Sequence, residues 1–379
     1  MKPIYFNIPH LTGKELMYMK RAVKTGKISG DGLFTRECQA QLEKAYGFKK
    51  VLLTNSCTDA LEMGAMLFNI KEGDEVIAPS FTFVSSVNPF VIRGANIAFA
   101  DSTATNPNMD IKQIESLITN KTKAIVVVHY AGVACDMDAI MNIAKKHKLL
   151  VIEDAAQCID SYYKKSALGS IGHVGAFSFH ESKNIITGEG GMLTVNDTSI
   201  NDRAEIIWEK GTNRRAFFKG KADKYEWVDV GSSFLPSDIT AAFLKAQLEE
   251  LDKIQKKRRR LWEQYYDQLK ELAKKNIMLP NIPEYATNNG HMFYLVCKSK
   301  DERSKLIEHL KKHKIQAVFH YQSLHKSPFY KDKYKGPELP NSDHYSDCLV
   351  RLPLYYDLKL NEVDHVCEQI LKFYKNFPA

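Results

Sequence analysis

The stretch SFHESKNIITGEGG, residues 178–191, decides how this sequence is interpreted. It places Lys183 after an aromatic-rich run that predicts a strand and before a glycine-rich turn. The glycines at 188, 190 and 191 allow backbone turns with positive φ. A lysine held at a strand end in this way can form a Schiff base with a carbonyl. For any single lysine a surface position beside an ordinary turn is the simpler interpretation, so the surrounding sequence has to distinguish the two.

Strands and helices alternate on both sides of this stretch. Short apolar strands are predicted at 51–54, 76–79, 97–101, 124–130, 149–154, 175–180 and 191–195, and helices at 58–68, 85–93 and 136–147. This alternation predicts an α/β fold with a large, mostly parallel sheet covered by helices. We expect ligands at the carboxyl ends of its strands.

The pattern changes near residue 237 to one long helical stretch, which looks like a bridge between domains. Its apolar stripe consists of Ala241, Leu244, Leu248 and Leu251. Beyond it we predict strands at 292–296 and 317–320 and helices at 302–312 and 362–373. We therefore expect a large cofactor-binding domain with an N-terminal arm at 1–240, and a linking helix with a small α+β domain at 241–379.

Composition excludes several classes of protein. The chain of 379 residues has a net charge of +8, part of which lies in the run 253–260, KIQKKRRR. No recognition-helix, RRM or zinc-finger pattern accompanies that run, so a solvated helix face is favoured over a nucleic-acid partner.

The seven scattered cysteines lack metal-ligand spacing and fit a reducing compartment. No apolar stretch is long enough to span a membrane, and we expect a cytoplasmic protein without a metal.

Acidic residues close the strand in VIEDAAQ, residues 151–157. A carboxylate buried at a strand end is costly unless it meets a positive partner. For Asp154 the pyridinium N–H of pyridoxal phosphate (PLP) is such a partner, and Gln157 is placed to bond the phenolic oxygen of the same ring. Taken alone, this pair of acids is more often a metal ligand or a helix cap.

Two more segments complete a possible PLP site. In VLLTNSCTDAL, residues 51–61, a strand leads through a polar turn into a helix whose first N–H groups, with Ser56 and Thr58, can hold a phosphate. Helix capping alone would also explain these residues, and no GxGxxG or GK[ST] sequence is present. In APSFTFVSS, residues 78–86, Phe83 could cover the face of a planar cofactor, although a core position is the default for a phenylalanine.

In this order, NSCTDAL, PSFTFVSS, IEDAAQ and SFHESKNIITGEGG resemble the DegT/DnrJ/StrS family of sugar aminotransferases, over essentially the whole chain. The resemblance implies the PLP-dependent aspartate aminotransferase fold, known as fold type I. It implies that Lys183 bonds the cofactor covalently and then moves the proton, and that Asp154 pairs with the ring nitrogen. The other cofactor contacts it implies are Gln157 to the phenolic oxygen, Phe83 to the ring face, and Cys57, Thr58 and Ser178 to the phosphate.

A narrower resemblance is carried by VHYAGVACDMD (128–138), EKGTNRRAFFKG (209–220), DKYEWVDVGSSF (223–234) and VFHYQSLH (318–325). These segments resemble the subgroup that aminates dTDP-4-oxo-6-deoxy-D-glucose with L-glutamate, giving dTDP-4-amino-4,6-dideoxy-D-galactose and 2-oxoglutarate for surface glycans such as lipopolysaccharide. The resemblance also implies a homodimer with shared active sites. The family's intersubunit Asn is absent here, so Ser233 or Ser232 is its candidate replacement. Candidate substrate-binding residues are Lys210, Asn213, Arg214, Tyr321 and His325.

Other functions remain open at this stage. A PLP-dependent sugar dehydratase would carry His in place of Lys183, and a Rossmann oxidoreductase would need a glycine-rich first turn. A noncatalytic sugar-binding protein would leave Lys183, Asp154 and Gln157 together unexplained. Within the aminotransferases, the alternatives are the gluco C4 epimer of the product and a 3-amino sugar.

Overall fold

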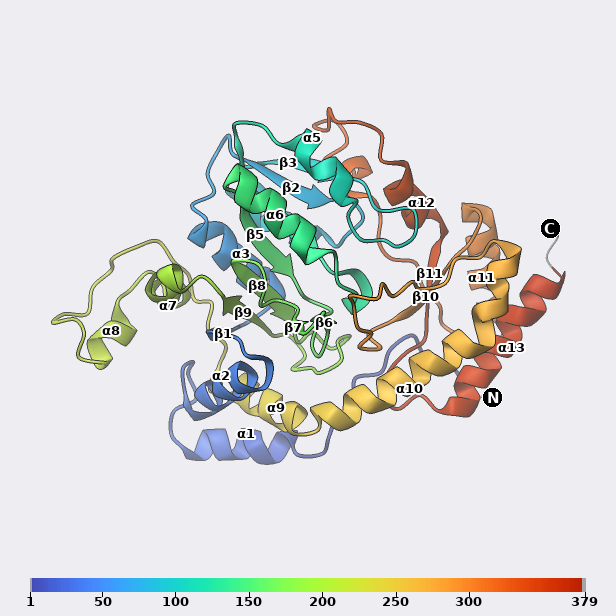
Figure 1. Cartoon of the computed structure of the whole chain (residues 1–379). Helices are drawn as coiled ribbons and strands as arrows, with labels where there is room; N and C mark the ends of the chain where they lie inside the picture. The colour runs from blue at the N-terminus through green and yellow to red at the C-terminus, as the bar shows by residue number, and fades with distance from the viewer. Residues whose placement is uncertain (1, 377–379) are drawn as a thin grey trace.

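The computed structural model describes residues 2–376 and is built around a seven-stranded sheet (Figure 1). Its strand order is β1-β9-β8-β5-β4-β2-β3, and β9 runs antiparallel to both neighbours while the other pairs are parallel. The prediction of a mostly parallel sheet is confirmed. The strands are β1 (Val51–Thr54), β2 (Glu75–Pro79), β3 (Asn96–Ala100), β4 (Thr122–Val128), β5 (Leu150–Asp154), β8 (Val174–Ser178) and β9 (Gly191–Val195).

Helices cover both faces of this sheet, because successive strand residues point to opposite sides. Leu53 and Val151 belong to one apolar core, and their chain neighbours Leu52 and Ile152 belong to another. The first core packs under α2 (Leu33–Tyr46), α6 (Met137–His147) and α9 (Asp238–Glu249), and the second under α3 (Cys57–Leu67) and α7 (Asn201–Trp208). Smaller elements complete this part: α1 (Glu15–Lys24), α4 (Asn88–Ile92), α5 (Ile114–Leu117), β6 (Tyr162–Tyr163), β7 (Ser166–Ala167) and α8 (Arg214–Phe218).

The C-terminal part forms a separate apolar core around a two-stranded antiparallel sheet. Its elements are α10 (Leu251–Leu269), β10 (Phe293–Val296), α11 (Lys300–Lys312), α12 (Pro340–Cys348), β11 (Leu349–Leu352) and α13 (Leu360–Asn376). Figure 1 shows α10 running along the molecule toward α11 and α13. The boundary at residue 240 stays a prediction.

Several predicted elements are wrong in detail. The long helical stretch is two helices, because Glu250 leaves helical geometry with φ −105° and ψ 8°. The predicted strand at 317–320 is only an isolated bridge between Val318 and Arg351. The predicted helix at 85–93 is a 3₁₀ turn, Val84–Ser86, followed by the short α4.

The basic run at 253–260 is not simply a solvated face. Arg258 is 2% exposed, and its guanidinium donates to the carbonyl oxygens of Gly290, His291 and Leu354. Burial lowers its pKa to about 9. The prediction of a solvated face is therefore wrong for this residue, which ties α10 to the segments that precede β10 and follow β11.

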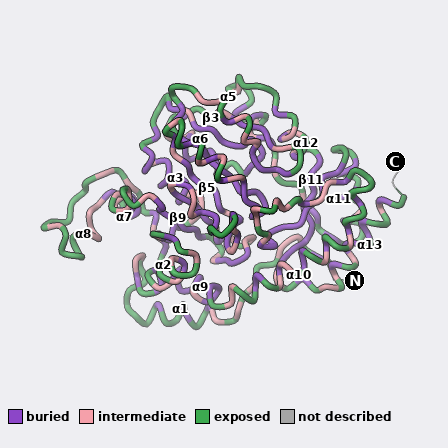
Figure 2. The backbone as a smooth tube through the Cα atoms, in the orientation of Figure 1, coloured by how far each residue is buried: buried purple, intermediate pink, exposed green. Residues whose placement is uncertain are grey.

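An arm at residues 209–234, which includes α8, projects away from the sheet (Figure 1). Figure 2 shows the loops of this arm mostly exposed, in contrast to the buried strands. Trp227 is 80% exposed and Phe218 is 71% exposed. Within residues 2–376, no helix is long and apolar enough to cross a membrane. The seven cysteines are all free thiols.

Candidate active site

A cavity of about 570 Å³ lies where β4, β5 and β8 end and α3 begins. Residues from 320–321 and from β11 line its other side, so the two parts of the chain share it. Its position at the carboxyl ends of parallel strands is the one expected from the sequence. The cavity brings together eight of the predicted site residues: Cys57, Thr58, Phe83, Asp154, Gln157, Ser178, Lys183 and Tyr321.

Asp154 ends β5 with its carboxylate aimed at this cavity. Ser86 donates to one carboxylate oxygen at 2.6 Å, and the N–H of Ala156 donates to the other at 3.1 Å. The side chain is buried, and burial raises its pKa despite these bonds and the charge of Lys183. A cationic group in the cavity would stabilise the ionised carboxylate. A pyridinium N–H fits that requirement.

Gln157 is fixed by two bonds beside Asp154. Its amide oxygen accepts from the N–H of Ala131 at 2.6 Å, and its amide nitrogen donates to the Tyr321 hydroxyl at 3.3 Å. Tyr321 is also in ring contact with Phe83, at 5.8 Å between centroids. Phe83 is 54% exposed, whereas its neighbour Phe81 is buried at 1%. Phe83 is therefore the aromatic of that segment that can face a planar ligand.

The first turn of α3 supplies donors for an anion. The Ser56 hydroxyl accepts from the N–H of Asp59 at 3.0 Å and so caps the helix, while the N–H groups of Cys57 and Thr58 lie in the first turn, which has no helical acceptors. The Thr58 hydroxyl donates to Ser85 at 2.9 Å. Burial holds the pKa of the Cys57 thiol well above its usual value. Cys57 therefore offers a backbone donor and not a thiolate.

The glycines before β9 act differently from the prediction. Only Gly188 of the three has a positive φ, +83°. A Cβ at Gly191 would lie 2.4 Å from the Ser56 carbonyl carbon and 2.5 Å from the Cys57 nitrogen, so the start of α3 rests directly on the Gly191 backbone. Gly190 similarly leaves room for the Thr187 hydroxyl, 2.1 Å from where its Cβ would be. Space and not dihedral freedom requires glycine at these two positions.

Lys183 lies on the loop that follows β8. Its backbone N–H donates to the His180 carbonyl at 2.9 Å, and the N–H of Thr187 returns the chain to the Phe179 carbonyl at 2.7 Å. Within residues 2–376 the Lys183 amine has no hydrogen bond or ion pair. The backbone of Lys183 is thus fixed by hydrogen bonds while its amine is free to react, and the residue lines the same cavity as Asp154.

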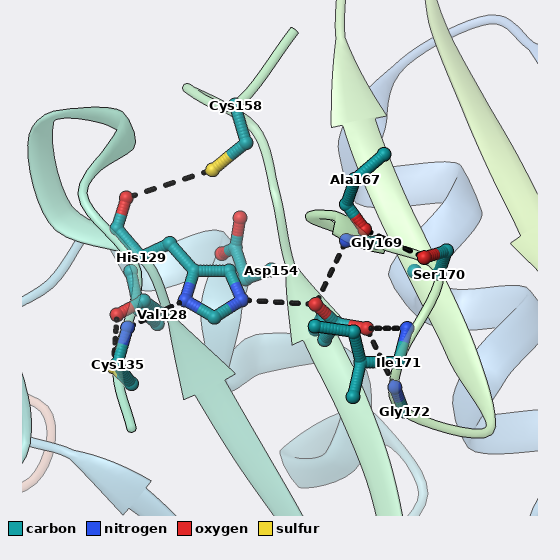
Figure 3. A network of polar contacts seen from close by, with 12 residues as sticks. Val128, His129, Cys135, Asp154, Cys158, Ala167, Gly169, Ser170, Ile171 and Gly172 are labelled. Atoms are coloured by element: carbon teal, nitrogen blue, oxygen red, sulfur yellow. Dashed lines mark hydrogen bonds and ion pairs between the residues drawn. The ribbon is translucent and has the colours of Figure 1, made fainter. Parts of the chain in front are cut away.

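A buried network that the sequence did not reveal lies under Asp154 (Figure 3). The Glu153 carboxylate accepts from the N–H groups of Gly169, Ile171 and Gly172 at 2.6–2.8 Å. It also contacts His129 Nε2 at 3.0 Å. Because His129 Nδ1 accepts from the N–H of Cys135, the ring proton is on Nε2 and points to Glu153. Glu153 therefore fixes the ends of β4 and β5 and the loop before β8.

The remaining predicted residues lie outside this cavity. His325 is buried, and its ring is 2.7 Å from the Ser80 hydroxyl and 3.7 Å from Asp343. Burial lowers its pKa. Four others belong to the arm and are held within it, namely Lys210, Asn213, Arg214 and Ser233.

Sequence reasoning missed several residues that line the cavity. Ser86 was within a quoted segment, and its bond to Asp154 could not be seen without the fold. Arg351 lies in β11, a strand that follows a polar helix and was not predicted. His291 precedes β10, and burial holds its pKa well below the usual histidine value.

The cavity residues fit PLP group by group. The buried Asp154 carboxylate suits the ring nitrogen, the α3 turn suits the phosphate, and the unengaged Lys183 amine suits the aldehyde. Gly191 provides the close approach that such a cofactor cradle needs.

Comparisons with known proteins agree with this fit. The sequence model of the DegT/DnrJ/EryC1/StrS aminotransferase family matches residues 9–371. The spore coat polysaccharide biosynthesis protein SpsC of Bacillus subtilis is 32% identical over 374 residues, covering 96% of this chain and 95% of SpsC. The GDP-perosamine synthase of Escherichia coli O157:H7 is 32% identical over 384 residues, covering 99% of this chain and all of that enzyme.

Solved structures give the same result. The Streptococcus pneumoniae protein Spr1654 in its PMP form superposes with a TM-score of 0.90 at 26% identity, over 98% of this chain and 99% of that one. Its PLP form gives 0.90 at 25% identity over the whole of both chains. An aminotransferase from Psychrobacter cryohalolentis gives 0.91 at 26% identity, over 97% of this chain and 98% of that one. The fold is that of PLP-dependent sugar aminotransferases, and PLP is the cofactor of this chain.

Proposed function

Because this chain belongs to the DegT/DnrJ/EryC1/StrS aminotransferase family, we propose that it moves an amino group from L-glutamate to C4 of dTDP-4-oxo-6-deoxy-D-glucose. The proposed products are dTDP-4-amino-4,6-dideoxy-D-galactose and 2-oxoglutarate. The chain is a PLP-dependent sugar aminotransferase; the particular sugar, its nucleotide and the product's stereochemistry are the proposal. The observation that carries the transamination is the meeting of Lys183, Asp154 and Gln157 in one cavity beside the start of α3. The choice of sugar is supported by the narrower sequence resemblance of residues 128–138, 209–220, 223–234 and 318–325.

Each residue has a defined task in this reaction. Bound PLP supplies an electron sink for the carbanion left when a proton is removed from the substrate carbon. Asp154 holds positive charge at the ring nitrogen, and the first turn of α3 holds the phosphate. The Lys183 amine, when free, takes the proton from one carbon and returns it to another. Gln157 holds the phenolic oxygen, and Phe83 covers the ring face.

A second copy of the chain is part of the proposal. Lys210, Asn213, Arg214 and Ser233 lie on the projecting arm and not in their own chain's cavity. The exposed aromatic side chains of Trp227 and Phe218 lie on the same arm. Large exposed apolar side chains of this kind favour a protein contact. We therefore place these four residues at the partner subunit's cavity in a homodimer, where they would contact the nucleotide sugar or the phosphate.

Tyr321 lines the chain's own cavity and is a candidate contact for the sugar, whereas His325 would act there only through neighbouring residues. A role in lipopolysaccharide or other surface glycan synthesis and a cytoplasmic location belong to the same proposal. The name of the relative SpsC refers to polysaccharide biosynthesis, and GDP-perosamine synthase is named for a nucleotide-linked amino sugar.

NMR of the product tests the substrate and the stereochemistry together. The protein is incubated with dTDP-4-oxo-6-deoxy-D-glucose and ¹⁵N-labelled L-glutamate, with a Lys183→Ala preparation as control. We expect ¹⁵N at C4 and a small H3–H4 coupling, which marks an axial amine. A large coupling would mean the gluco epimer. An enzyme that makes a 3-amino sugar would leave this 4-oxo sugar unreacted and would transfer ¹⁵N only to a 3-oxo sugar. No transfer to this sugar would overturn the proposed substrate.

A further inference from the structure

His291 is held in one orientation by a buried network next to Lys183. Its ring Nδ1 lies 2.9 Å from the Asn184 amide oxygen, and its backbone N–H donates to the Asn289 side-chain oxygen at 3.0 Å. The Asn184 amide nitrogen donates to the Asn289 carbonyl oxygen at 3.0 Å and to the Gln255 side-chain oxygen at 2.8 Å. Asn184 directly follows Lys183 in the chain, so one loop positions both the histidine ring and the reacting lysine.

These contacts decide which ring nitrogen of His291 carries the proton. A backbone carbonyl only accepts, so the Asn184 atom that contacts the Asn289 carbonyl is the amide nitrogen, and the atom that faces His291 is the amide oxygen. That oxygen also only accepts, and the ring proton is therefore on Nδ1. Nε2 then presents a lone pair. It has no hydrogen bond within residues 2–376 and is accessible from the active-site cavity, which His291 lines.

The charges around the His291 ring keep it neutral. Burial lowers its pKa well below the usual histidine value, and the charges of Lys183, Arg351 and Arg258 lower it further. A second proton on the ring would add a buried cation beside three others, which is costly. His291 can therefore accept a hydrogen bond in the cavity, but it does not keep a proton taken from a reacting group.

The Lys183 amine is the donor that this lone pair lacks. In the part of the chain that the structure describes, the amine has no hydrogen bond or ion pair, and it lines the same cavity. Its charge lowers the pKa of His291 more than any other charge does. The lone pairs of the other cavity histidines are already occupied, by Arg351 at His320, by the N–H of Cys135 at His129 and by the N–H of Ser182 at His180.

We propose that His291 is a positioning residue for Lys183, whose amine donates one N–H to Nε2 when it is not bonded to the cofactor. This inference rests on the proposed role of Lys183 as the group that moves the proton. Fixing one N–H restricts the rotation of the amine, so less freedom is lost in each proton transfer. The amine takes a proton from one carbon, becomes an ammonium that still donates to Nε2, and returns the proton to the other carbon. His291 neither gains nor loses a proton.

Two variants separate this role from a structural one. His291→Asn can keep the donor that faces Asn184 but lacks the Nε2 acceptor, whereas His291→Gln can place its amide oxygen near the Nε2 position and loses the donor. His309→Asn is the control, because His309 is half-buried on α11, its Nε2 lies 3.1 Å from the Gln369 carbonyl oxygen, and it does not line the cavity. The holoenzymes react with L-glutamate and with L-glutamate that carries deuterium at the reacting carbon.

We expect proton transfer in His291→Asn to slow by about 10- to 100-fold and the deuterium effect on the donor half-reaction to rise, because that step becomes limiting. The dissociation constant for L-glutamate and all values for His309→Asn should change by less than about threefold. His291→Gln should react at least about fivefold faster than His291→Asn, because it retains an acceptor. An unchanged rate in His291→Asn would overturn the proposal. A rate in His291→Asn equal to or above that of His291→Gln would overturn it too, by showing that the contact with Asn184 is what matters.

NMR of the cofactor-free protein gives a readout that does not depend on turnover. In protein labelled with ¹⁵N at histidine, His291 is identified by its protonated Nδ1, its unprotonated Nε2 and the absence of its signal from His291→Asn. Lys183→Met removes the amine and keeps a long side chain. We expect the Nε2 signal to move to higher chemical shift in Lys183→Met, because the nitrogen loses its donor. An unmoved signal would overturn the proposal.

If the His291 variants fail to fold, the comparison of Lys183→Met with the unaltered protein decides alone. Failure of the proposed function has a different signature from failure of this inference. If Lys183→Met moves the Nε2 signal but Lys183→Ala still transfers the amino group, the contact exists and the proposed role of Lys183 is wrong.

Discussion

Asp154 shows how much a single buried charge contributes at the residue scale. Its carboxylate has Ser86 and Ala156 as donors and is still destabilised by burial, so the proposed pyridinium of the cofactor would supply the cationic partner that it lacks. Asp154→Asn keeps the size and loses the charge. We expect transamination to fall by about 100- to 1,000-fold, the range found when one electrostatic stabiliser is removed from an active site. Stopped-flow rates with L-glutamate, together with cofactor content, provide the measurement.

Ser86→Ala is the matched control for this variant, because it removes a 2.6 Å bond and leaves the carboxylate in place. Its rate should fall by about 10-fold or less. Equal rates for Asp154→Asn and the unaltered protein would mean that the carboxylate has a different role.

The sequence predicted which residues meet in the cavity where a reactive side chain lies at or just after the end of a predicted strand, and their roles stay predictions. Asp154 ends one predicted strand and Lys183 follows another, and parallel strands bring such ends together. Arg351 and His129 could not be found in this way. Their significance comes from partners far away in the sequence, His320 and Phe6 for Arg351 and Glu153 for His129, and neither has a motif of its own.

At the scale of elements, the site depends on how closely α3 approaches β9. Gly191→Ala would place a Cβ 2.4–2.6 Å from backbone atoms of Ser56 and Cys57, so the start of α3 has to move. We expect the affinity for PLP to fall by about 10-fold or more, because the phosphate donors move with that turn. Titration of cofactor-free protein with PLP measures this.

Gly188→Asn is the control for the same loop. Gly188 has open space around its Cβ position, and asparagine tolerates its positive φ of +83° better than other residues. This variant should bind PLP within about threefold of the unaltered protein. Similar losses in the two variants would mean that general loop strain, and not the contact with α3, controls the affinity.

The elements themselves were predictable where the apolar period was unambiguous, as in β1, β5 and β9. The break between α9 and α10 was not predictable, because the apolar stripe continues through Leu248 and Leu251 on both sides of Glu250. The short β11 was hidden for another reason. Its residues pair with β10, which lies more than fifty positions earlier in the sequence. The polar helix directly before β11 contains no pattern that would predict a strand after it.

At the scale of the whole molecule, the burial of His291 makes the free energy of unfolding depend on pH. His291 is 4% exposed and its Nδ1 lies 2.9 Å from the Asn184 amide oxygen. Burial, and then the charge of Lys183, lowers its pKa well below 6.5. The unfolded chain binds a proton near pH 6.5 and the folded chain does not. The free energy of unfolding should therefore fall as the pH falls below about 6.5, by up to about 1.4 kcal/mol per pH unit for this residue.

Denaturant unfolding at pH 7.5, 6.5 and 5.5 measures this slope. His291→Asn keeps a donor at the Nδ1 position and cannot be protonated, so its unfolding free energy should fall less steeply with acid than that of the unaltered protein. Parallel curves for the two proteins would show that His291 does not resist protonation.

The central claim is that Lys183 carries the amino-transfer chemistry in the cavity shared with Asp154. The most direct measurement compares Lys183→Ala with the unaltered protein, by the visible absorbance of bound PLP and by ¹⁵N transfer from labelled L-glutamate to the keto-sugar. Borohydride reduces the link between lysine and PLP, so that covalently attached cofactor stays on the denatured protein. After this treatment we expect Lys183→Ala to retain no cofactor absorbance. We also expect it to transfer no ¹⁵N above background. Transfer at an undiminished rate by Lys183→Ala would contradict the account.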